Sequence, residues 1–208
     1  MLIAGAGGHA KEIIEVLLQN GEDDIILFDD VSPAKDKLFN RFKILHSLEE
    51  VKSLFKKNNN FIAGIGKPHS RKHICDKLIS CGGQLASAIS INAKISSLDT
   101  TIGNGVNIMQ RVIIQPSVSI GDGCLINAGA IIHHDSVIGK FSEIAPSVTV
   151  TGNCNIGNYV FIGTGAIISP NIIIGDNAIV GAGSVVLKNI ADGEKVTGIP
   201  AVGKKNTI

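Results

Sequence analysis

An aliphatic residue recurs at every sixth position along the second half of the chain. From Ile102 to Val186, fifteen consecutive samples are all Ile or Val, and five of them begin Ile-Gly pairs spaced 18 residues apart. Apolar residues make up 44% of the sequence, so chance does not produce such a run. A fixed period of this kind indicates a repeat architecture rather than a mixed globular core.

The position four residues after each aliphatic residue is also restricted. From Val106 to Ser184 it is Val, Ala, Ser or Cys, with Ile172 as the one large exception. We interpret each six-residue unit as one short strand and one turn, and three units as one triangular coil. Inward aliphatic residues then stack at the ~4.8 Å spacing of neighbouring strands. Gly, Asn and Asp after the aliphatic residue are expected to supply the backbone freedom of the turns.

The repeat predicts nearly five coils over residues 102–187. A less regular run from Ile89 to Ser97 predicts one more coil, out of register with the rest. Cys124 and Cys154 occupy the small inward positions, so we expect them to be structural. The four cysteines form no CxxC pair, and we expect all of them to be reduced, without a zinc site.

Residues 1–85 follow a different pattern, in which short apolar stretches alternate with helical periodicity. Ser47 and Glu50 match a capping box at the start of the second helical stretch. This order predicts a small parallel, Rossmann-like α/β domain over 1–85, followed by a parallel β-helix domain with a C-terminal tail over 86–208. The expected elements are strands over 2–4, 25–28 and 61–65, and helices over 9–19, 47–57 and 69–80.

A glycine-rich turn joins the first predicted strand to the first helix. The sequence GAGGHA at 5–10 fits the pattern GxGxxA, and two aspartates follow the second strand about 20 residues later. Backbone N–H groups at such a helix start bind phosphate; a purely structural turn is the alternative. Because the segment is short for a dinucleotide domain, we expect a mononucleotide or nucleotide-sugar. The expected binding residues are Gly7, Gly8, His9, Asp29, Asp30, Gly66 and Lys67.

The third predicted helix leaves two questions open. Lys67, at its start, is expected to face a second phosphate or the edge of a uracil. Arg71 has two alternatives, a role at that same site or an ordinary solvated helix charge. His69 and His73 have a spacing that can bind metal, but no third ligand is evident, so we expect solvated histidines.

Composition and charge exclude several functional classes. The net charge is +1 and no basic block runs along the chain, which argues against nucleic acid as a partner. No apolar stretch approaches the ~20 residues needed to span a bilayer. The apolar N-terminus lacks a basic flank and is interpreted as a first strand rather than a signal peptide. We therefore expect a cytoplasmic protein with no membrane partner.

Four segments together resemble one family of hexapeptide-repeat acyltransferases. They are GAGGHAKEI at 5–13, FDD at 28–30, GIGKPHSRKHI at 64–74 and HDSVIGKFSEIAP at 134–146. They are similar to the sugar O- and N-acetyltransferases, which include the PglD and PerB kind of aminosugar acetyltransferase and the NeuD sialic acid O-acetyltransferase. The resemblance implies a left-handed β-helix and a homotrimer. It also implies that acetyl-CoA is bound between two β-helices, with no metal.

The resemblance implies that His134 is a general base and Asp135 its partner. Histidine suits this role because the acceptor amine or hydroxyl must lose a proton as it attacks the thioester, an effect of ~10²–10⁴ in rate. Asp135 would hold the imidazole tautomer, and the Gly152 amide is expected to stabilise the oxyanion. His133 is an alternative base, although we favour a turn residue or a supporting contact.

The resemblance also implies where the acyl donor binds. Glu143 stands where the family often has a histidine that contacts donor or acceptor. Its charge would favour a cationic amine on the acceptor, or the side chain is a solvated carboxylate. The residues expected to contact acetyl-CoA are Glu143, Gly152, Gly163, Gly181, Ala182 and Lys188, with Lys204 as a further phosphate ligand.

The expected activity is acetyl transfer to the amine of a nucleotide-linked 4-amino-4,6-dideoxy sugar, in the biosynthesis of bacterial surface glycans. An O-acetyltransferase acting on sialic acid or another sugar hydroxyl is the first alternative. A catalytically silent nucleotide-binding or assembly protein is the second, and the His134-Asp135 pair argues against it. A β-helix carbonic anhydrase is disfavoured because only His133 and His134 occur within the repeat.

Overall fold

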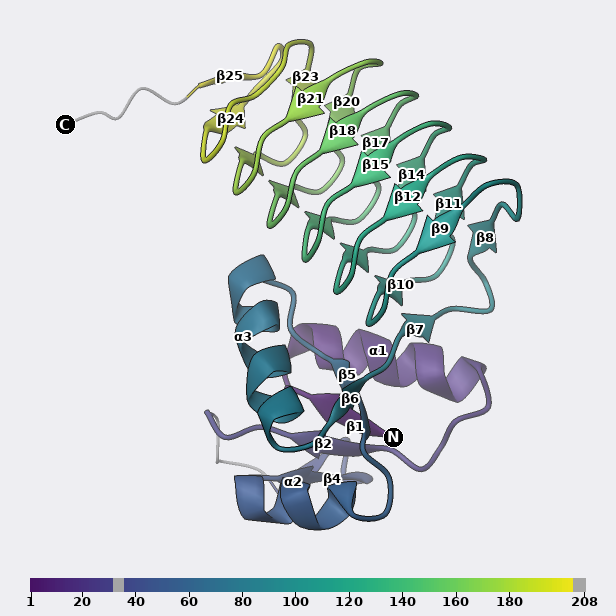
Figure 1. Ribbon diagram of the computed structural model, residues 1–208, viewed down its shortest axis with the longest axis vertical. Coiled ribbons are helices and arrows are strands. Elements are labelled where there is room, and N and C mark those ends of the chain that lie inside the picture. Colours follow the sequence, from purple (N-terminus) through teal and green to yellow (C-terminus); the bar gives the residue numbers. More distant parts are fainter. Residues whose placement is uncertain (32–35, 204–208) are drawn as a thin grey trace, which may run out of the picture.

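The computed structural model describes residues 1–31 and 36–203. Figure 1 shows an α/β part that contains the N-terminus and, joined to it, a column of triangular coils that ends in the C-terminal strands. The arrangement confirms the predicted fold class, a small parallel-sheet domain followed by a parallel β-helix.

The α/β part is built on a six-stranded sheet in the order β3-β4-β2-β1-β5-β6. All neighbours are parallel except β3 and β4. The three predicted strands and three predicted helices are present, and Ser47 and Glu50 form the expected capping box. The strands are β1 (Leu2–Ala4), β2 (Ile26–Phe28), β3 (Lys37–Leu38), β4 (Phe42–Leu45), β5 (Asn60–Ala63) and β6 (Gln84–Leu85). The helices are α1 (Gly8–Gln19), α2 (Leu48–Phe55) and α3 (Pro68–Ser80).

The β-helix has three faces, each a ladder of parallel two- or three-residue strands, with β25 antiparallel at one end. The first face contains β7 (Ala88–Ile89), β10 (Asn107–Ile108), β13 (Leu125–Ile126), β16 (Glu143–Ile144), β19 (Phe161–Ile162), β22 (Ile179–Val180), β24 (Lys195–Thr197) and β25 (Val202–Gly203). The second contains β8 (Lys94–Ile95), β11 (Ile113–Ile114), β14 (Ile131–Ile132), β17 (Thr149–Val150), β20 (Ile167–Ile168) and β23 (Val185–Val186). The third contains β9 (Thr101–Ile102), β12 (Ser119–Ile120), β15 (Val137–Ile138), β18 (Asn155–Ile156) and β21 (Ile173–Ile174).

We number the corners of the coil in chain order. The first corner joins the first face to the second, the second corner joins the second face to the third, and the third corner leads back to the first face. Strands pair with a step of 18 residues, as from Ile126 to Ile144. The first coil differs, because Ala88 pairs with Asn107 and Lys94 with Ile113, a step of 19. The predicted extra coil, out of register, is therefore confirmed.

The interior of the coils is the stack of aliphatic residues that the period predicts. On the first face the fully buried aliphatic residues are Ile108, Ile126, Ile144 and Ile162. The small inward residue four positions after each aliphatic residue is buried as well, as at Val106. The turns differ in one respect from the prediction. Left-handed backbone falls at the third residue after each aliphatic position, every six residues from Gly105 to Gly183, and not directly after it.

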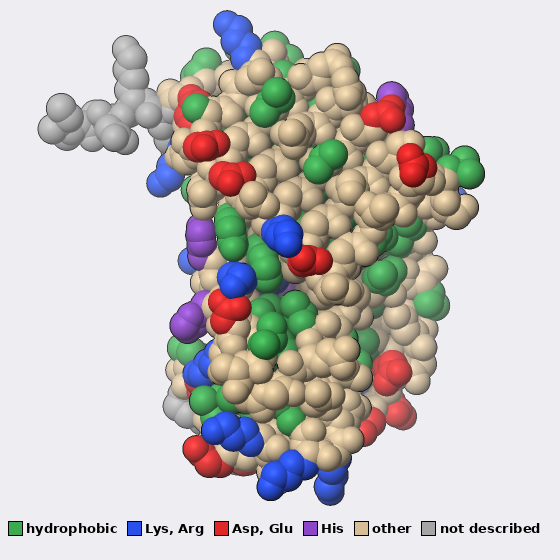
Figure 2. All heavy atoms as spheres, in the orientation of Figure 1, with side chains coloured by type: hydrophobic (Ala, Val, Ile, Leu, Met, Phe, Trp, Pro, Cys, Tyr) green, Lys and Arg blue, Asp and Glu red, His purple; other side chains and the backbone are tan. Residues whose placement is uncertain are grey.

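The α/β part packs on the β-helix through two helices. On the first face, Val16 of α1 packs with Met109 and Leu125. At the third corner, Phe141 and Tyr159 join the cluster that includes α3. On the face shown in Figure 2, hydrophobic side chains gather near this junction, while Lys, Arg, Asp and Glu side chains are scattered. Of the described helices, none has the length and apolar character needed to cross a membrane.

Candidate active site

A pocket of about 780 Å³ opens at the carboxyl ends of β1, β2 and β5. Gly5 makes the tight turn out of β1 at φ 114, and a Cβ there would come within 3.0 Å of the Gly64 carbonyl oxygen. This turn aims the N-terminus of α1 at the pocket, where N–H groups and the helix dipole favour an anion. Six of the predicted substrate-binding residues line the pocket together: Gly7, Gly8, His9, Asp29, Asp30 and Gly66.

Some of the charged residues around this pocket form an ion pair with one another. Asp30 pairs with Lys77 of α3, which also lines the pocket. Lys67 is the exception among the predicted residues, because it is the exposed N-cap of α3 and is not part of the pocket wall. His69 and His73 line the wall from α3. In the part of the chain that the structure describes, no group of three or more His, Cys, Asp or Glu residues could hold a metal ion.

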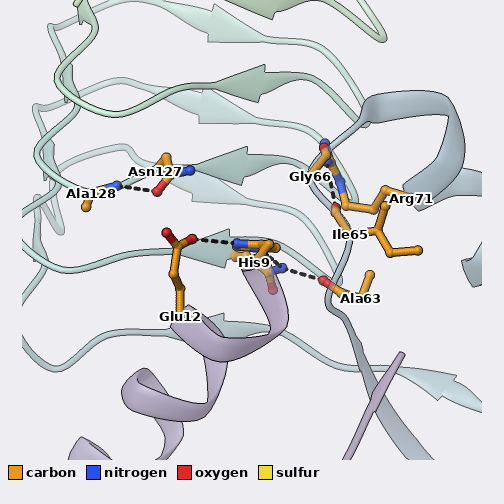
Figure 3. Close-up of polar contacts among 9 residues, drawn as sticks. His9, Glu12, Ala63, Ile65, Gly66, Arg71, Asn127 and Ala128 are labelled. Carbon is orange, nitrogen blue, oxygen red and sulfur yellow. Dashed lines mark hydrogen bonds and ion pairs between the residues drawn. The ribbon is translucent and has the colours of Figure 1, made fainter. Parts of the chain in front are cut away.

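Arg71 corrects both sequence-based alternatives, because it neither lines the pocket nor lies in solvent. Its side chain is 0% exposed, and its five N–H groups all donate to backbone carbonyls. Figure 3 shows the side chain beside two of these acceptors, Ile65 and Gly66. Two acceptors, Ile65 and Gly66, belong to the loop of the pocket. The other three lie at the third corner of the β-helix: Gly123 at 2.7 Å, Phe141 at 2.8 Å and Ser142 at 3.1 Å.

A stack of three rings lies at the same junction and was not predicted. His69 stacks on Tyr159 with ring centroids 4.8 Å apart, and Tyr159 stacks on Phe141 at 5.9 Å. Phe141 and Tyr159 both have left-handed backbone, φ 55 and 57, a conformation that bulky residues rarely adopt. The sequence contained a signal for this stack. Phe141 and Tyr159 stand at the corner position that Gly105, Gly123 and Asn177 occupy in other coils.

Glu143 is not the solvated carboxylate that was one of its predicted alternatives. It lies on the first face in β16 and is only 8% exposed. Its oxygens lie 3.6 and 3.7 Å from the place a Cβ on Gly66 would occupy. The side chain therefore faces the pocket loop of the α/β part. It was expected among the acetyl-CoA contacts, but Gly163, Gly181 and Ala182 lie farther along, at the first corner.

His134 and Asp135 lie at the second corner. Asp135 has left-handed backbone with φ 60, which Asp tolerates better than most residues. Its Oδ2 lies 2.7 Å from Nδ1 of His134, and both side chains are more than half exposed. This contact favours the tautomer that carries its proton on Nδ1, and it leaves Nε2 free to accept one. His133 is half-buried, and its amide donates to the Val150 carbonyl.

Gly152 lies one coil beyond His134, and the space beside its Cα is filled by the His134 ring. A Cβ on Gly152 would come within 2.7 Å of the His134 Cε1 and 2.8 Å of Nε2. Among the described residues, none accepts a hydrogen bond from the Gly152 amide. The histidine ring thus lies against the Cα of Gly152, where any Cβ would displace the ring, and a free N–H group lies beside it.

We expect Gly152→Ala to lower the rate of catalysis by about 10-fold or more, because the new Cβ would push the imidazole out of position and small misplacements are costly. The measurement is kcat, together with the Tm of the variant. Gly103→Ala is the matched control, since its Cβ would crowd Asp122 at 2.7 Å in an early coil, far from His134. If both variants lost stability and neither lost kcat, the seating of His134 would be irrelevant to the reaction.

The other predicted donor-binding residues lie on two different corners. At the first corner, Gly163 packs on the next coil so closely that a Cβ would lie 2.6 Å from the Ala182 amide nitrogen, next to Gly181. Lys188 is exposed at the second corner, three coils beyond His134. Lys204 lies outside the described residues. A single chain therefore places His134 at the second corner of the β-helix and the tightly stacked glycines at the first corner.

The buried cysteines do not provide nucleophiles. Burial raises the pKa of the Cys75 thiol to about 12 and that of Cys124 to about 11. Cys124 also donates to the Gly139 carbonyl oxygen at 2.9 Å. Because the reactive form is the thiolate, these two thiols are inert near neutral pH. Cys75, Cys124 and Cys154 are buried, whereas Cys81 is partly exposed.

Comparison with known proteins identifies the family. The PglD N-terminal domain model matches residues 1–78, and the bacterial transferase hexapeptide model matches 99–134, 119–152 and 153–188. The perosamine N-acetyltransferase of Caulobacter crescentus, solved as a histidine-to-asparagine variant with CoA and GDP-perosamine, is 30% identical. The two chains match over 99% of this chain and 96% of that one, with a TM-score of 0.90. The chain belongs to the sugar O- and N-acetyltransferase family.

Two further members of the family have the same architecture. The acetyltransferase domain of PglB from Neisseria gonorrhoeae, in complex with acetyl coenzyme A, is 28% identical over 98% of both chains, with a TM-score of 0.90. WeeI from Acinetobacter baumannii is 27% identical over 98% of both chains, with a TM-score of 0.87. No curated protein sequence matches significantly. As a family member the chain is an acyltransferase, and its coils form a left-handed parallel β-helix.

Proposed function

We propose that this sugar acetyltransferase moves the acetyl group of acetyl-CoA to the amine of a nucleotide-linked 4-amino-4,6-dideoxy sugar. The observation that carries the proposal is the pairing of a phosphate-type pocket with an exposed His-Asp pair in one chain. The relative from Caulobacter crescentus binds CoA and GDP-perosamine, and the PglB domain binds acetyl coenzyme A. A cytoplasmic role in bacterial surface glycan biosynthesis is the wider context that we propose.

In this proposal, each of the two parts of the chain binds one substrate. Residues 1–85 hold the nucleotide-sugar, with its phosphates at the N-terminus of α1, and residues 86–208 bring the acyl donor. The amine nitrogen attacks the thioester carbonyl, the C–S bond breaks, and CoA leaves as a thiolate that takes up the proton removed from the amine. His134 takes the proton of the amine at Nε2 while Asp135 stabilises the imidazolium. The free amide of Gly152 is the donor that we assign to the oxyanion.

We further propose that the enzyme works as a homotrimer. Gly163 and Gly181 lie at the first corner and His134 at the second, so a groove containing both kinds of residue requires a second copy. The outward side chains of the second face support this arrangement. Four of the five from β11 to β23 are Ile or Val, and Ile167 remains 45% exposed, the kind of apolar stripe that marks an interface.

The decisive experiment is release of CoA thiol from acetyl-CoA with a panel of acceptors. The panel contains GDP-perosamine, UDP- and dTDP-linked 4-amino-4,6-dideoxyglucose, and free sialic acid. We expect turnover on one of the 4-amino sugars and none on free sialic acid. Turnover confined to a hydroxyl acceptor would replace the proposal with O-acetylation. Binding of acetyl-CoA without turnover on any acceptor would contradict our assignment of the substrate.

A further inference from the structure

The seam between the pocket loop and the first face of the β-helix contains a carboxylate that the mechanism above does not use. Glu143 projects from β16 toward Gly66, which lines the pocket. More than nine-tenths of its surface is buried, and the remaining 8% leaves it open to a small molecule. His9, at the start of α1, is another pocket residue close enough to influence Glu143.

Among the described residues, none donates a hydrogen bond to either oxygen of Glu143, and these oxygens keep some exposed surface. The nearby cation cannot supply one, because all five N–H groups of Arg71 donate to carbonyls. His9 is engaged too, since Nδ1 lies 3.1 Å from Glu12 and Nε2 lies 3.3 Å from Asn107. Figure 3 shows His9 between these neighbours and Arg71 turned toward Ile65 and Gly66.

The seam has more acceptors than donors. Asn107, two strands from Glu143 on the same face, donates to the Ala63 carbonyl at 2.8 Å, but its own Oδ1 is buried without a partner. Burial raises the pKa of the Glu143 carboxyl, and the attraction of Arg71 offsets only part of this effect. A ligand that complements this place therefore carries a hydrogen-bond donor.

We propose that Glu143 is a specificity-determining residue that accepts a hydrogen bond from a donor on the acceptor sugar, an ammonium or a hydroxyl group. The inference rests on the proposed function, because the sugar reaches Glu143 only if its nucleotide occupies the pocket. Gly66 links the two, since it lines the pocket and a Cβ built on it would lie 3.6 Å from a Glu143 oxygen. The correct sugar would supply a donor to a carboxylate that has no hydrogen-bond partner among the described residues.

The test is calorimetric binding of GDP-perosamine and of GDP alone, with the UDP and dTDP analogues of the panel used in the same way. We expect Glu143→Ala to raise the Kd of the nucleotide-sugar by about 10- to 100-fold, the loss of one charge-assisted hydrogen bond. The Kd of the nucleoside diphosphate should stay within about twofold. Glu143→Gln distinguishes the two donors: an ammonium loses its affinity, whereas a hydroxyl keeps most of it.

Stability separates this role from a purely structural one. Because the folded-state pKa of Glu143 is raised, the ionised carboxylate destabilises the folded protein at neutral pH, and this penalty disappears as pH falls below the ordinary value of 4.5. Glu143→Gln should therefore leave the Tm at pH 7 unchanged or raise it. Glu49→Gln makes the same chemical change at an exposed position on α2 and serves as control.

The outcomes separate the two proposals. If the wild type binds the nucleotide-sugar more tightly than the nucleotide and Glu143→Ala does not change that difference, the role of Glu143 is wrong and the proposed function stands. Equal losses for sugar and nucleotide, or a lowered Tm in Glu143→Gln, would make the residue structural. If the wild type binds none of the probes, the proposed function fails and the Glu143 inference fails with it.

Discussion

Replacing His134 with alanine is expected to lower kcat for acetyl transfer by about 10²–10⁴-fold. The physical reason is the geometry at the second corner, where Asp135 contacts Nδ1 at 2.7 Å and leaves Nε2 to take the proton. The exposed side chain supports no other part of the fold through a hydrogen bond that the structure describes. The Tm and the Kd for the nucleotide-sugar should therefore change little, while kcat falls.

Two variants sharpen this prediction. Asp135→Asn keeps a residue that tolerates the left-handed backbone of this corner, so it should remain folded and lose activity through the lost charge. His133→Ala tests the neighbouring histidine, whose ring is half-buried, and it should retain most of the activity. If His133→Ala were the inactive variant and His134→Ala the active one, the assignment of the base would have to be exchanged.

Replacing Arg71 with methionine is expected to reduce the free energy of unfolding by about 3–5 kcal/mol. The change removes five hydrogen bonds to carbonyl groups, three of them buried, and removes the cation beside Glu143. For a chain of this size the Tm should fall by roughly 2–4 °C for each kcal/mol lost. Thermal unfolding followed by circular dichroism measures the effect.

Arg71→Lys and Arg41→Met provide the comparison. Lysine has a single charged nitrogen on a flexible stem and cannot reproduce the planar fork, so Arg71→Lys should recover only part of the loss. Arg41 is exposed and lies over the Phe42 ring, and its replacement should cost less than about 1 kcal/mol. If Arg71→Met were as mild as Arg41→Met, the buried guanidinium would not be what joins the two parts of the chain.

The β-helix could be predicted almost completely from the sequence, because its structure repeats a local rule. Each six-residue unit makes its own strand and turn, so the run from Ile102 to Val186 determines which side chains point inward. The extra coil of 19 residues was also visible, since the apolar run before Ile102 breaks the period. Strands β3, β4 and β6 were missed. For β3 and β6 the reason is that a two-residue strand has no recognisable alternation of its own.

The junction of the two parts could not be predicted in the same way. The carbonyl partners of Arg71 at the third corner lie 52 to 71 positions away along the chain, and nothing near residue 71 indicates them. Glu143 occupies an outward strand position, which is exposed in an isolated β-helix. It becomes buried because the α/β part docks over the first face. His134 and Asp135 are adjacent in sequence, so their pairing needed no knowledge of the packing.

The ring stack at the junction also makes the protein its own optical probe. The chain has one tyrosine and no tryptophan, so its intrinsic emission comes almost entirely from Tyr159. That ring lies against His69, a wall residue of the pocket, and against Phe141 of the β-helix. A single native chromophore therefore reports both the filling of the pocket and the contact between the two parts, without any label.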